Sequence, residues 1–298
     1  MLDDWTSPAL AEAILLSSGA ALLAAGAIRI TAQGRWKFLL ALPATRPLPI
    51  RPIDPAMALA AMWLLPHLAL AMLGGESSSA TQPASAPAAV DELPDAARIM
   101  AVGVGQLAAA IVLLLLGATR FRGSLRAWGL TLADLPRRIG QALLAYIAIW
   151  PICFGLLHLT VYLMRLADPE FAPREHQTIR TLLSSEHAPG LIALVAMNAV
   201  LLAPLIEELF FRGLFQPVLA MAARGPWAAV LFAAAAFGLF HFPLVHTMPA
   251  LAAFGLWLGY LYARTGSLTL VVLLHMIFNG KTLLWLAWSI ASGDVPAQ

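Results

Sequence analysis

Long apolar stretches recur along the whole chain, and they constrain the fold more than any other feature. About eight of them approach the roughly 20 residues that an α-helix needs to cross the ~30 Å hydrocarbon core of a membrane. Hydrophobic residues make up 60% of the chain and charged residues only 11%, against about 25% charged residues in an ordinary soluble domain. So few charged side chains could not cover the surface of a soluble protein of this size. The pattern predicts an integral membrane protein.

The same stretches favour an all-α, polytopic fold. They lack the alternating pattern of about ten residues that marks a membrane β-barrel strand, and helices and closed barrels are the two structures that satisfy backbone polar groups in lipid. The sixth and seventh stretches are short, so we expect tilted helices or a thinner bilayer there. The predicted spans lie near Pro8–Ile28, Pro55–Leu73, Arg98–Ala118, Ile139–Leu163, Leu191–Ala222, Pro226–Phe242, Met248–Ala263 and Leu268–Ile290.

The polar segments between the spans predict the orientation. The loops after the first and third spans are rich in arginine, so the positive-inside rule places both in the cytoplasm. With eight spans, both termini then lie outside the cytoplasm. The acidic segment between the second and third spans and the polar segment Asp168–Pro189 are predicted to be outer loops. In a prokaryote the membrane would be the plasma membrane.

Three parts of the chain can be separated along the sequence. Residues 1–120 hold the N-terminal transmembrane helices. Residues 121–190 hold a segment predicted to lie in the inner membrane interface, Phe121–Arg138, followed by the fourth helix and an outer loop. Residues 191–290 form a C-terminal core, where we expect the active site to lie in a cavity between helices.

Charge and cysteine content exclude several classes of protein. The formal net charge is +2 and the basic residues are scattered, so no basic stripe for nucleic acid is present. The single cysteine, Cys153, excludes an internal disulfide framework and a cysteine-based zinc site. We expect Cys153 to serve helix packing.

Ionisable residues inside the fifth span are the strongest indication of function, because such residues cost free energy in a membrane and usually face a protein interior or a water-filled cavity. Glu208 and Arg212 are four residues apart, so they share a helix face and can form an ion pair. Glu207 points about 100° away from Glu208 and lacks that partner. A carboxylate in such surroundings can serve as a general base toward water.

Two further fragments carry polar groups at helical spacing. Phe237 and His241 lie four residues apart in the sixth span, and His275 and Asn279 lie four apart in the eighth. An isolated His or Asn in a membrane helix often serves only to bond neighbouring helices. Three fragments in one half of the chain favour convergence on one cavity, whereas the first four spans contribute little. An imidazole could share the water or hold a metal, and an amide could donate to a developing oxyanion.

The three fragments together resemble the CAAX proteases and bacteriocin-processing enzymes, called the CPBP or Abi family. The family pattern is Glu-Glu-x-x-x-Arg, then Phe-x-x-x-His, then His-x-x-x-Asn. Here the corresponding segments are Glu207–Arg212, Phe237–His241 and His275–Asn279, preceded by the Leu-x-x-Trp-Gly-Leu segment Leu125–Leu130. The resemblance covers roughly Leu191–Ile290. It implies an intramembrane endopeptidase related to the eukaryotic Ras-converting CAAX protease.

The resemblance also implies roles for the individual residues. Glu207 would activate the water and His241 would help to position it, while His275 and Asn279 would form the oxyanion hole. The supporting residues would be Glu208, Arg212 and Phe237. The His-Glu-x-x-His spacing of familiar zinc proteases is absent from the sequence, so we favour a mechanism that requires no cofactor. A divalent metal such as zinc, if used, would be held by Glu207, His241 and His275.

Other interpretations remain open at this stage. The chain could be a non-catalytic immunity or scaffold protein of the same fold, or a proton-coupled transporter. The expected partners are the lipid bilayer and a membrane-associated or lipidated peptide or protein, prenylated or not, with no nucleic acid. His246 is expected to be an outer-loop histidine rather than a second imidazole near the site. Lys281, inside the last span, could reach the interface or pair with a carboxylate.

Overall fold

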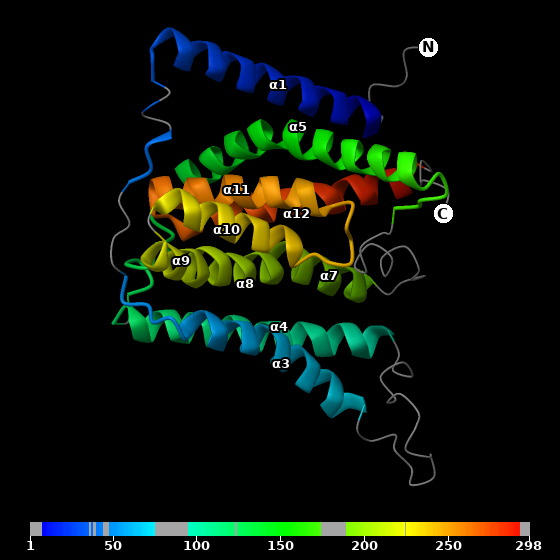
Figure 1. Ribbon diagram of the computed structural model, residues 1–298. Helices are drawn as coiled ribbons and strands as arrows, with labels where there is room; N and C mark the ends of the chain where they lie inside the picture. Colours follow the sequence, from blue (N-terminus) through cyan, green and yellow to red (C-terminus); the bar gives the residue numbers. More distant parts are fainter. Residues whose placement is uncertain are drawn as a thin grey trace.

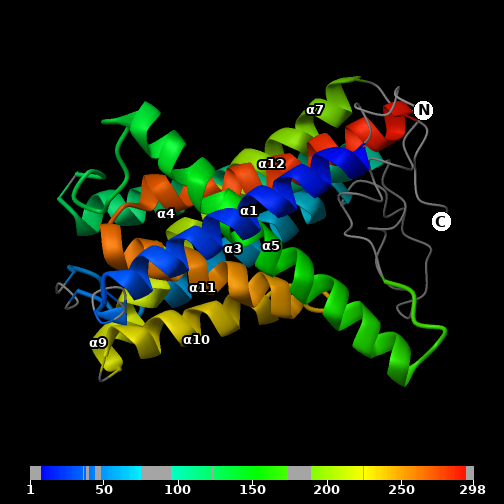
Figure 2. The ribbon, with the colours of Figure 1, turned by 90° about the horizontal axis from the view of Figure 1, so that it is seen from above.

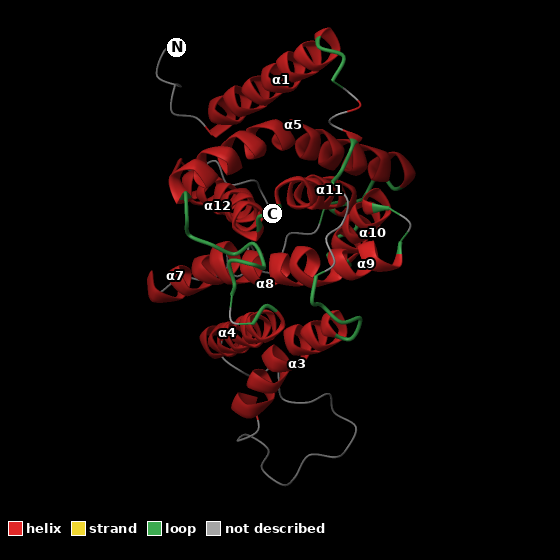
Figure 3. Ribbon diagram, turned by 90° about the vertical axis from the view of Figure 1, so that its left-hand side faces the viewer, coloured by secondary structure: helices red, strands yellow, loops and turns green. Residues whose placement is uncertain are grey.

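The computed structural model describes residues 8–35, 37, 40–43, 48–74, 95–122, 124–173, 189–223 and 225–292. The predicted loop between the second and third spans and most of 168–189 lie outside these residues. All regular structure within the described residues is helical, as Figure 3 shows, and the all-α prediction is confirmed. The helices are α1 (Pro8–Ala32), α3 (Asp54–Gly74), α4 (Asp95–Arg120), α5 (Leu135–Ala167), α7 (Pro189–Met197), α8 (Ala203–Phe210), α9 (Gln216–Ala222), α10 (Pro226–Leu239), α11 (Met248–Thr265) and α12 (Leu268–Ser292).

The helices stack in layers, with α8 near the middle of the molecule (Figure 1). Two π-helical turns, η2 (Asn198–Leu202) and η3 (Phe211–Phe215), join α7, α8 and α9 into one rod. The paired helices α3 and α4 pack on one side of this rod, and α10 and α12 pack on the other. Helix α5 covers α11 and α12, and α1 lies outermost on α5.

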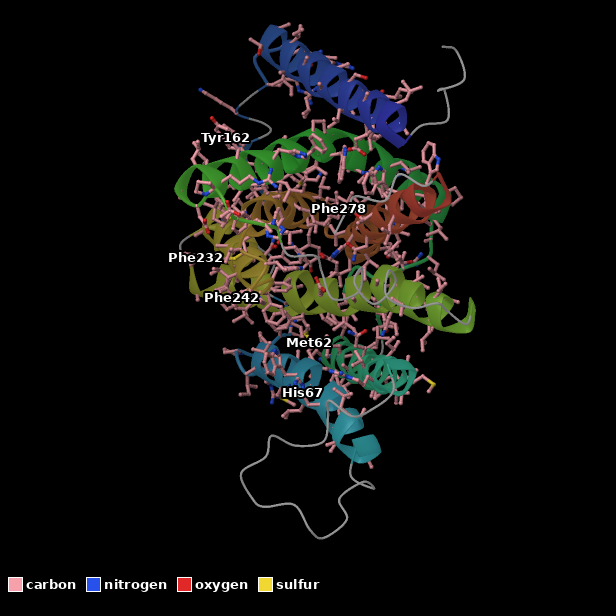
Figure 4. The ribbon with its side chains drawn as sticks, turned by 90° about the vertical axis from the view of Figure 1, so that its right-hand side faces the viewer. Met62, His67, Tyr162, Phe232, Phe242 and Phe278 are labelled. Atoms are coloured by element: carbon pink, nitrogen blue, oxygen red, sulfur yellow. The ribbon has the colours of Figure 1, made fainter. Side chains whose placement is uncertain are left out.

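The outer surface of the stack is apolar, as expected of a protein surrounded by lipid. Large apolar side chains point outward from several helices, including Leu166, Phe232 and Leu284, each more than half exposed. Figure 4 shows Phe232 and Tyr162 at the outer edge of the molecule. A contiguous apolar surface of this extent would not be stable in water. The protein is an integral, multi-pass membrane protein.

Six helices among the described residues are long and apolar enough to cross a membrane. The two that fall short are α10 and α11, which occupy the sixth and seventh predicted spans. Helix α10 has 14 residues, a length of about 21 Å at 1.5 Å per residue. Each of the eight predicted spans therefore corresponds to a helical segment, but α10 is too short for a perpendicular crossing of an ordinary bilayer.

Successive spans alternate in direction, so the connections between them lie at the two ends of the stack (Figure 2). The arginine-rich connections after α1 and after α4 lie at the same end, as the orientation prediction requires. The same end holds the turn between α11 and α12, where Gly266 ends α11 at φ 63°. Left-handed backbone of this kind is readily adopted by glycine.

A partly buried polar contact joins the outermost helix, α1, to the rest of the bundle. The Lys281 Nζ of α12 donates to Glu12 Oε2 of α1 at 2.6 Å, and the Trp150 indole of α5 donates to Glu12 Oε1 at 2.6 Å. The ammonium group also lies 3.8 Å from the centre of the Trp150 ring. Lys281 thus pairs with a carboxylate, which was one of its two predicted roles, and joins α1 to α5 and α12.

Helices α3 and α4 form a tight antiparallel pair. A Cβ atom on Gly105 would lie 2.3 Å from the Pro66 Cα, so only glycine permits this approach. At the basic end of the pair, Arg120 donates to both carboxylate oxygens of the fully buried Asp54, at 2.8 and 2.6 Å. The pair therefore forms a firm wall against α8.

Candidate active site

Pro204 disturbs the rod just before the two glutamates, and Asn279 compensates for it. Proline has no N–H, so the carbonyl of Ala199, five residues earlier in the π-helical turn η2, lacks its helical donor. The Nδ2 of Asn279, from α12, donates to this oxygen at 2.9 Å. This bond fixes α12 against the rod about two helical turns before Glu207. It uses one of the two N–H groups of the Asn279 amide.

Pro217 has the same effect on the other side of the glutamates. It cannot donate to the Gly213 carbonyl four residues earlier, and the indole Nε1 of Trp128 donates there at 2.9 Å instead. Trp128, within the predicted interfacial segment Phe121–Arg138, is 1% exposed, so its ring is buried in the bundle. The physical reason is that a buried indole requires an acceptor, which the proline provides in η3. The π-helical turns therefore lie on both sides of the predicted catalytic residues, a position typical of functional sites.

Glu208 is the centre of a buried polar network. Its Oε1 accepts from the Nη1 of Arg212 at 2.8 Å and from the Nδ1 of His275 at 2.9 Å. The Arg212 Nη2 donates to the Gly255 carbonyl of α11 at 2.9 Å. Glu208 and Arg212 are fully buried, and His275 is 4% exposed. The predicted ion pair is present, and it orients His275 as well.

Glu207 lies outside that network. Its side chain is 21% exposed, and its Oε2 is buried with no hydrogen-bond partner. The nearest cationic candidate is the His275 Nε2, at 3.9 Å from Oε2, which is too long for a hydrogen bond. The imidazole of His275 therefore stands between two carboxylates, bonded to Glu208 and facing Glu207.

Phe237 brings the three predicted fragments together. Its fully buried ring lies 5.0 Å from the His241 ring and 5.7 Å from the His275 ring. The Arg212 guanidinium carbon lies 4.7 Å from the same ring centre, within cation–π range. Behind His275, Phe254 stacks on Phe278, and Figure 4 shows Phe278 between α5 and α12.

His241 takes one defined hydrogen bond. Its Nδ1 lies 2.8 Å from the Phe237 carbonyl oxygen, one helical turn earlier. A carbonyl only accepts, so Nδ1 carries the proton in this bond and the Nε2 of the neutral ring keeps its lone pair. His241 can therefore accept a hydrogen bond through Nε2.

A cavity of about 180 Å³ lies over Glu207. Figure 4 shows Met62, one of its wall residues, between α3 and the rod. Gln106, from α4, was not identified from the sequence, and its Oε1 is buried without a hydrogen-bond partner. The cavity is lined by Met62, Trp63, Gln106, Ala109, Ala203, Ile206, Glu207 and Phe240.

A larger cavity, of about 330 Å³, lies at the basic end of the stack. Residues from α9, α11 and the connection after α4 line it, among them Trp128, Gln216 and Arg264. Its lining residues include none of the predicted catalytic residues. The smaller cavity contains Glu207, while His241, His275 and Asn279 are not among its lining residues.

His246 lies on the connection between α10 and α11 and is 7% exposed. Its ring faces Phe171 at 6.3 Å, on the connection that follows α5. Burial lowers the pKa of His246 below its usual value. It is thus a buried loop residue.

The donor set for a metal is incomplete in this arrangement. Glu207 and His275 face each other, but the described residues contain no group of three or more His, Cys, Asp or Glu side chains placed to hold one ion. A catalytic zinc site ordinarily takes three protein ligands. The described residues therefore do not fit a catalytic zinc ion.

The comparisons with known proteins agree with the geometry. Residues 189–280 match the family model of the type II CAAX prenyl endopeptidase Rce1-like proteins. No curated protein and no solved structure matches the chain. The matched segment runs from the start of α7 into α12 and contains all three fragments gathered around Phe237. The match over residues 189–280 thus supports the similarity to the type II CAAX prenyl endopeptidase Rce1-like family.

Proposed function

We propose that the protein is an intramembrane endopeptidase in which the Glu207 carboxylate activates a water molecule. The observation that carries this proposal is the difference between the two adjacent glutamates. Each glutamate keeps a buried Oε2 without a partner. The Oε1 of Glu208 is occupied by Arg212 and His275, whereas Glu207 is the one of the two that lines a cavity. Glu207 is thus the carboxylate that can take a proton from water.

The neighbouring residues have groups suited to the remaining steps. His241 offers the Nε2 lone pair as an acceptor to which the water or the substrate amide can donate. Asn279 keeps one N–H that its bond to Ala199 does not use. Donation by His275 from Nε2 as well as Nδ1 requires the imidazolium form. With that form, Glu207, Glu208, Arg212 and His275 sum to zero charge, which limits the cost of burying them together.

The reaction then proceeds without a bound cofactor. Glu207 accepts one proton from the water as its oxygen attacks the peptide carbonyl carbon. The oxyanion receives hydrogen bonds from His275 and Asn279, and the proton on Glu207 passes to the amine as the carbon–nitrogen bond breaks. The substrate is a membrane-associated or lipidated peptide or protein, because the cavity is bounded by helices that face lipid.

Cleavage of a quenched, membrane-associated peptide library by the purified protein tests this proposal. We expect Glu207→Gln to lower the rate by about 10²–10⁴-fold, the usual contribution of a general base. The matched control is Glu170→Gln, which makes the same change on an exposed connection. Equal cleavage by wild type and Glu207→Gln would contradict the proposal and favour a non-catalytic role for the fold.

A second arm tests whether a metal is needed. We expect the wild-type rate to be unchanged by a strong zinc chelator. Loss of cleavage with the chelator, restored by added zinc, would refute the metal-free mechanism while leaving the protease assignment in place.

A further inference from the structure

Gln106 is a polar residue of the N-terminal half that lies at the Glu207 cavity. It belongs to α4, outside the segment that matches the family model. Of the residues that line the cavity, Gln106 and Glu207 are the two whose side chains carry oxygen acceptors. The Oε1 of Gln106 and the Oε2 of Glu207 are both buried without a hydrogen-bond partner. One small space therefore holds two side chains that require donors.

A buried acceptor without a donor is costly, at about 1–3 kcal/mol. Buried polar atoms in native proteins almost always have a partner, and a water molecule supplies one where the space is polar and large enough. A cavity of about 180 Å³ is large enough for water. A single water molecule carries two hydrogens, which is the number that the two acceptors require.

We propose that Gln106 positions the nucleophilic water by accepting its second hydrogen bond; this inference rests on the function proposed above. One O–H of the water points to the Glu207 carboxylate and the other to Gln106 Oε1. The oxygen lone pairs then point away from both walls, toward the substrate carbonyl. When the oxygen–carbon bond forms, the proton on the first O–H moves to Glu207. The second O–H remains intact and stays bonded to Gln106, so the tetrahedral intermediate is held in place.

The packing of α4 supports such a role, because a positioning group requires a rigid support. Gly103 allows the Asn198 side chain to approach, at 3.4 Å from an added Cβ, and Gly105 allows the contact with Pro66. Ala109, one turn beyond Gly105, is 1% exposed. Gln106 thus lies on a part of α4 that packs against the rod near Gly103 and against α3 near Gly105.

The decisive variant is Gln106→Met, which keeps the length and approximate volume of the side chain but removes the acceptor. We expect kcat for the peptide cleaved by wild type to fall about tenfold or more, the equivalent of one lost hydrogen bond in the transition state. KM and the thermal unfolding midpoint should stay unchanged. The matched control is Leu107→Met on the lipid-facing side of the same helix, where the side chain is 50% exposed. This control should keep the wild-type kcat.

Gln106→Glu distinguishes positioning from packing. It keeps an acceptor oxygen, so at alkaline pH its kcat should exceed that of Gln106→Met. The added like charge near Glu207 should move the acid limb of the pH–rate profile to higher pH. A residue that only fills space would leave that limb in place and would tolerate methionine.

The outcomes separate this inference from the proposed function. If Glu207→Gln loses cleavage while Gln106→Met keeps the wild-type kcat, the inference fails and the proposed function stands. If Glu207→Gln cleaves as wild type does, or wild type cleaves no member of the library, both fail together. A lower kcat for Gln106→Met with a lower unfolding midpoint would also overturn the inference, because packing alone would then explain the loss.

Discussion

Removal of the Glu208 carboxylate should destabilise the protein more than removal of any partly exposed charge. Glu208→Leu keeps a similar volume but deprives two buried donors, Arg212 Nη1 and His275 Nδ1, of their common acceptor. Arg212 would keep its bond to Gly255 and its contact with the Phe237 ring. Breaking one side of a buried ion pair costs about 3–5 kcal/mol, and we expect a loss of this size in the free energy of unfolding.

The matched control is Glu12→Gln, which breaks the pair with Lys281. Both side chains of that pair are partly exposed, at 15% and 21%, and glutamine still offers an acceptor to Trp150. Pairs of this kind contribute at most about 1 kcal/mol. The free energies can be measured by unfolding each purified variant with increasing SDS in mixed micelles, followed by far-UV circular dichroism.

The double variant Glu208→Leu/Arg212→Met tests the cause of the loss. If the loss arises from an uncompensated buried charge, replacing the guanidinium with an apolar side chain should restore at least half of it. A loss for Glu208→Leu no larger than that for Glu12→Gln would refute the reasoning. A double variant as unstable as the single one would likewise show that lost packing, rather than charge, sets the cost.

Two further predictions concern backbone and pH. Gly129→Ala should lower the free energy of unfolding by at least about 1–3 kcal/mol, because Gly129 has φ 92° and an added Cβ would lie 2.2 Å from the Gly266 carbonyl oxygen. The control Gly140→Ala, in a helix with open space around it, should instead be stabilising by about 0.5–1 kcal/mol; the same SDS titration measures both. Burial lowers the pKa of His246 below its usual 6.5, so the unfolded chain binds its proton more readily, and stability should fall as pH drops through 6.5 and below. His246→Phe should remove this part of the acid dependence of the thermal unfolding midpoint, and an unchanged dependence would contradict the assignment.

The sequence predicted the helical spans well because the apolar stretches are long and their limits are marked by proline and charge. The predicted starts at Pro8, Pro226, Met248 and Leu268 are the first residues of α1, α10, α11 and α12. The membrane-crossing lengths were less well predicted. The apolar stretch continues past Leu239 to Phe242, but α10 ends at Leu239 and the residues after it form turns. Composition alone does not distinguish those turns from helix.

The packing of the central rod could be predicted only in part. Pro204 and Pro217 show from the sequence that two carbonyls must lack helical donors. They do not show which distant side chains replace the donors, since Trp128 and Asn279 come from other helices or connections. The Leu-x-x-Trp-Gly-Leu segment has an arginine, Arg126, among its apolar residues, a pattern that is also typical of interfacial segments. This pattern does not predict the contact of Trp128 with the Gly213 carbonyl.

The candidate site divides into residues that the sequence reveals by charge or by motif and one, Gln106, that it reveals by neither. Glu207, Glu208 and Arg212 attract notice because ionised groups are expensive in a membrane. Gln106 is neutral, and a single amide in a transmembrane helix ordinarily bonds to a neighbouring helix. Its significance comes from the opposite observation, that its buried Oε1 bonds to no neighbour and shares a cavity with Glu207. In a membrane protein the sequence can therefore locate charged catalytic groups, whereas a neutral group that orients water is found by asking which buried acceptor still needs a donor.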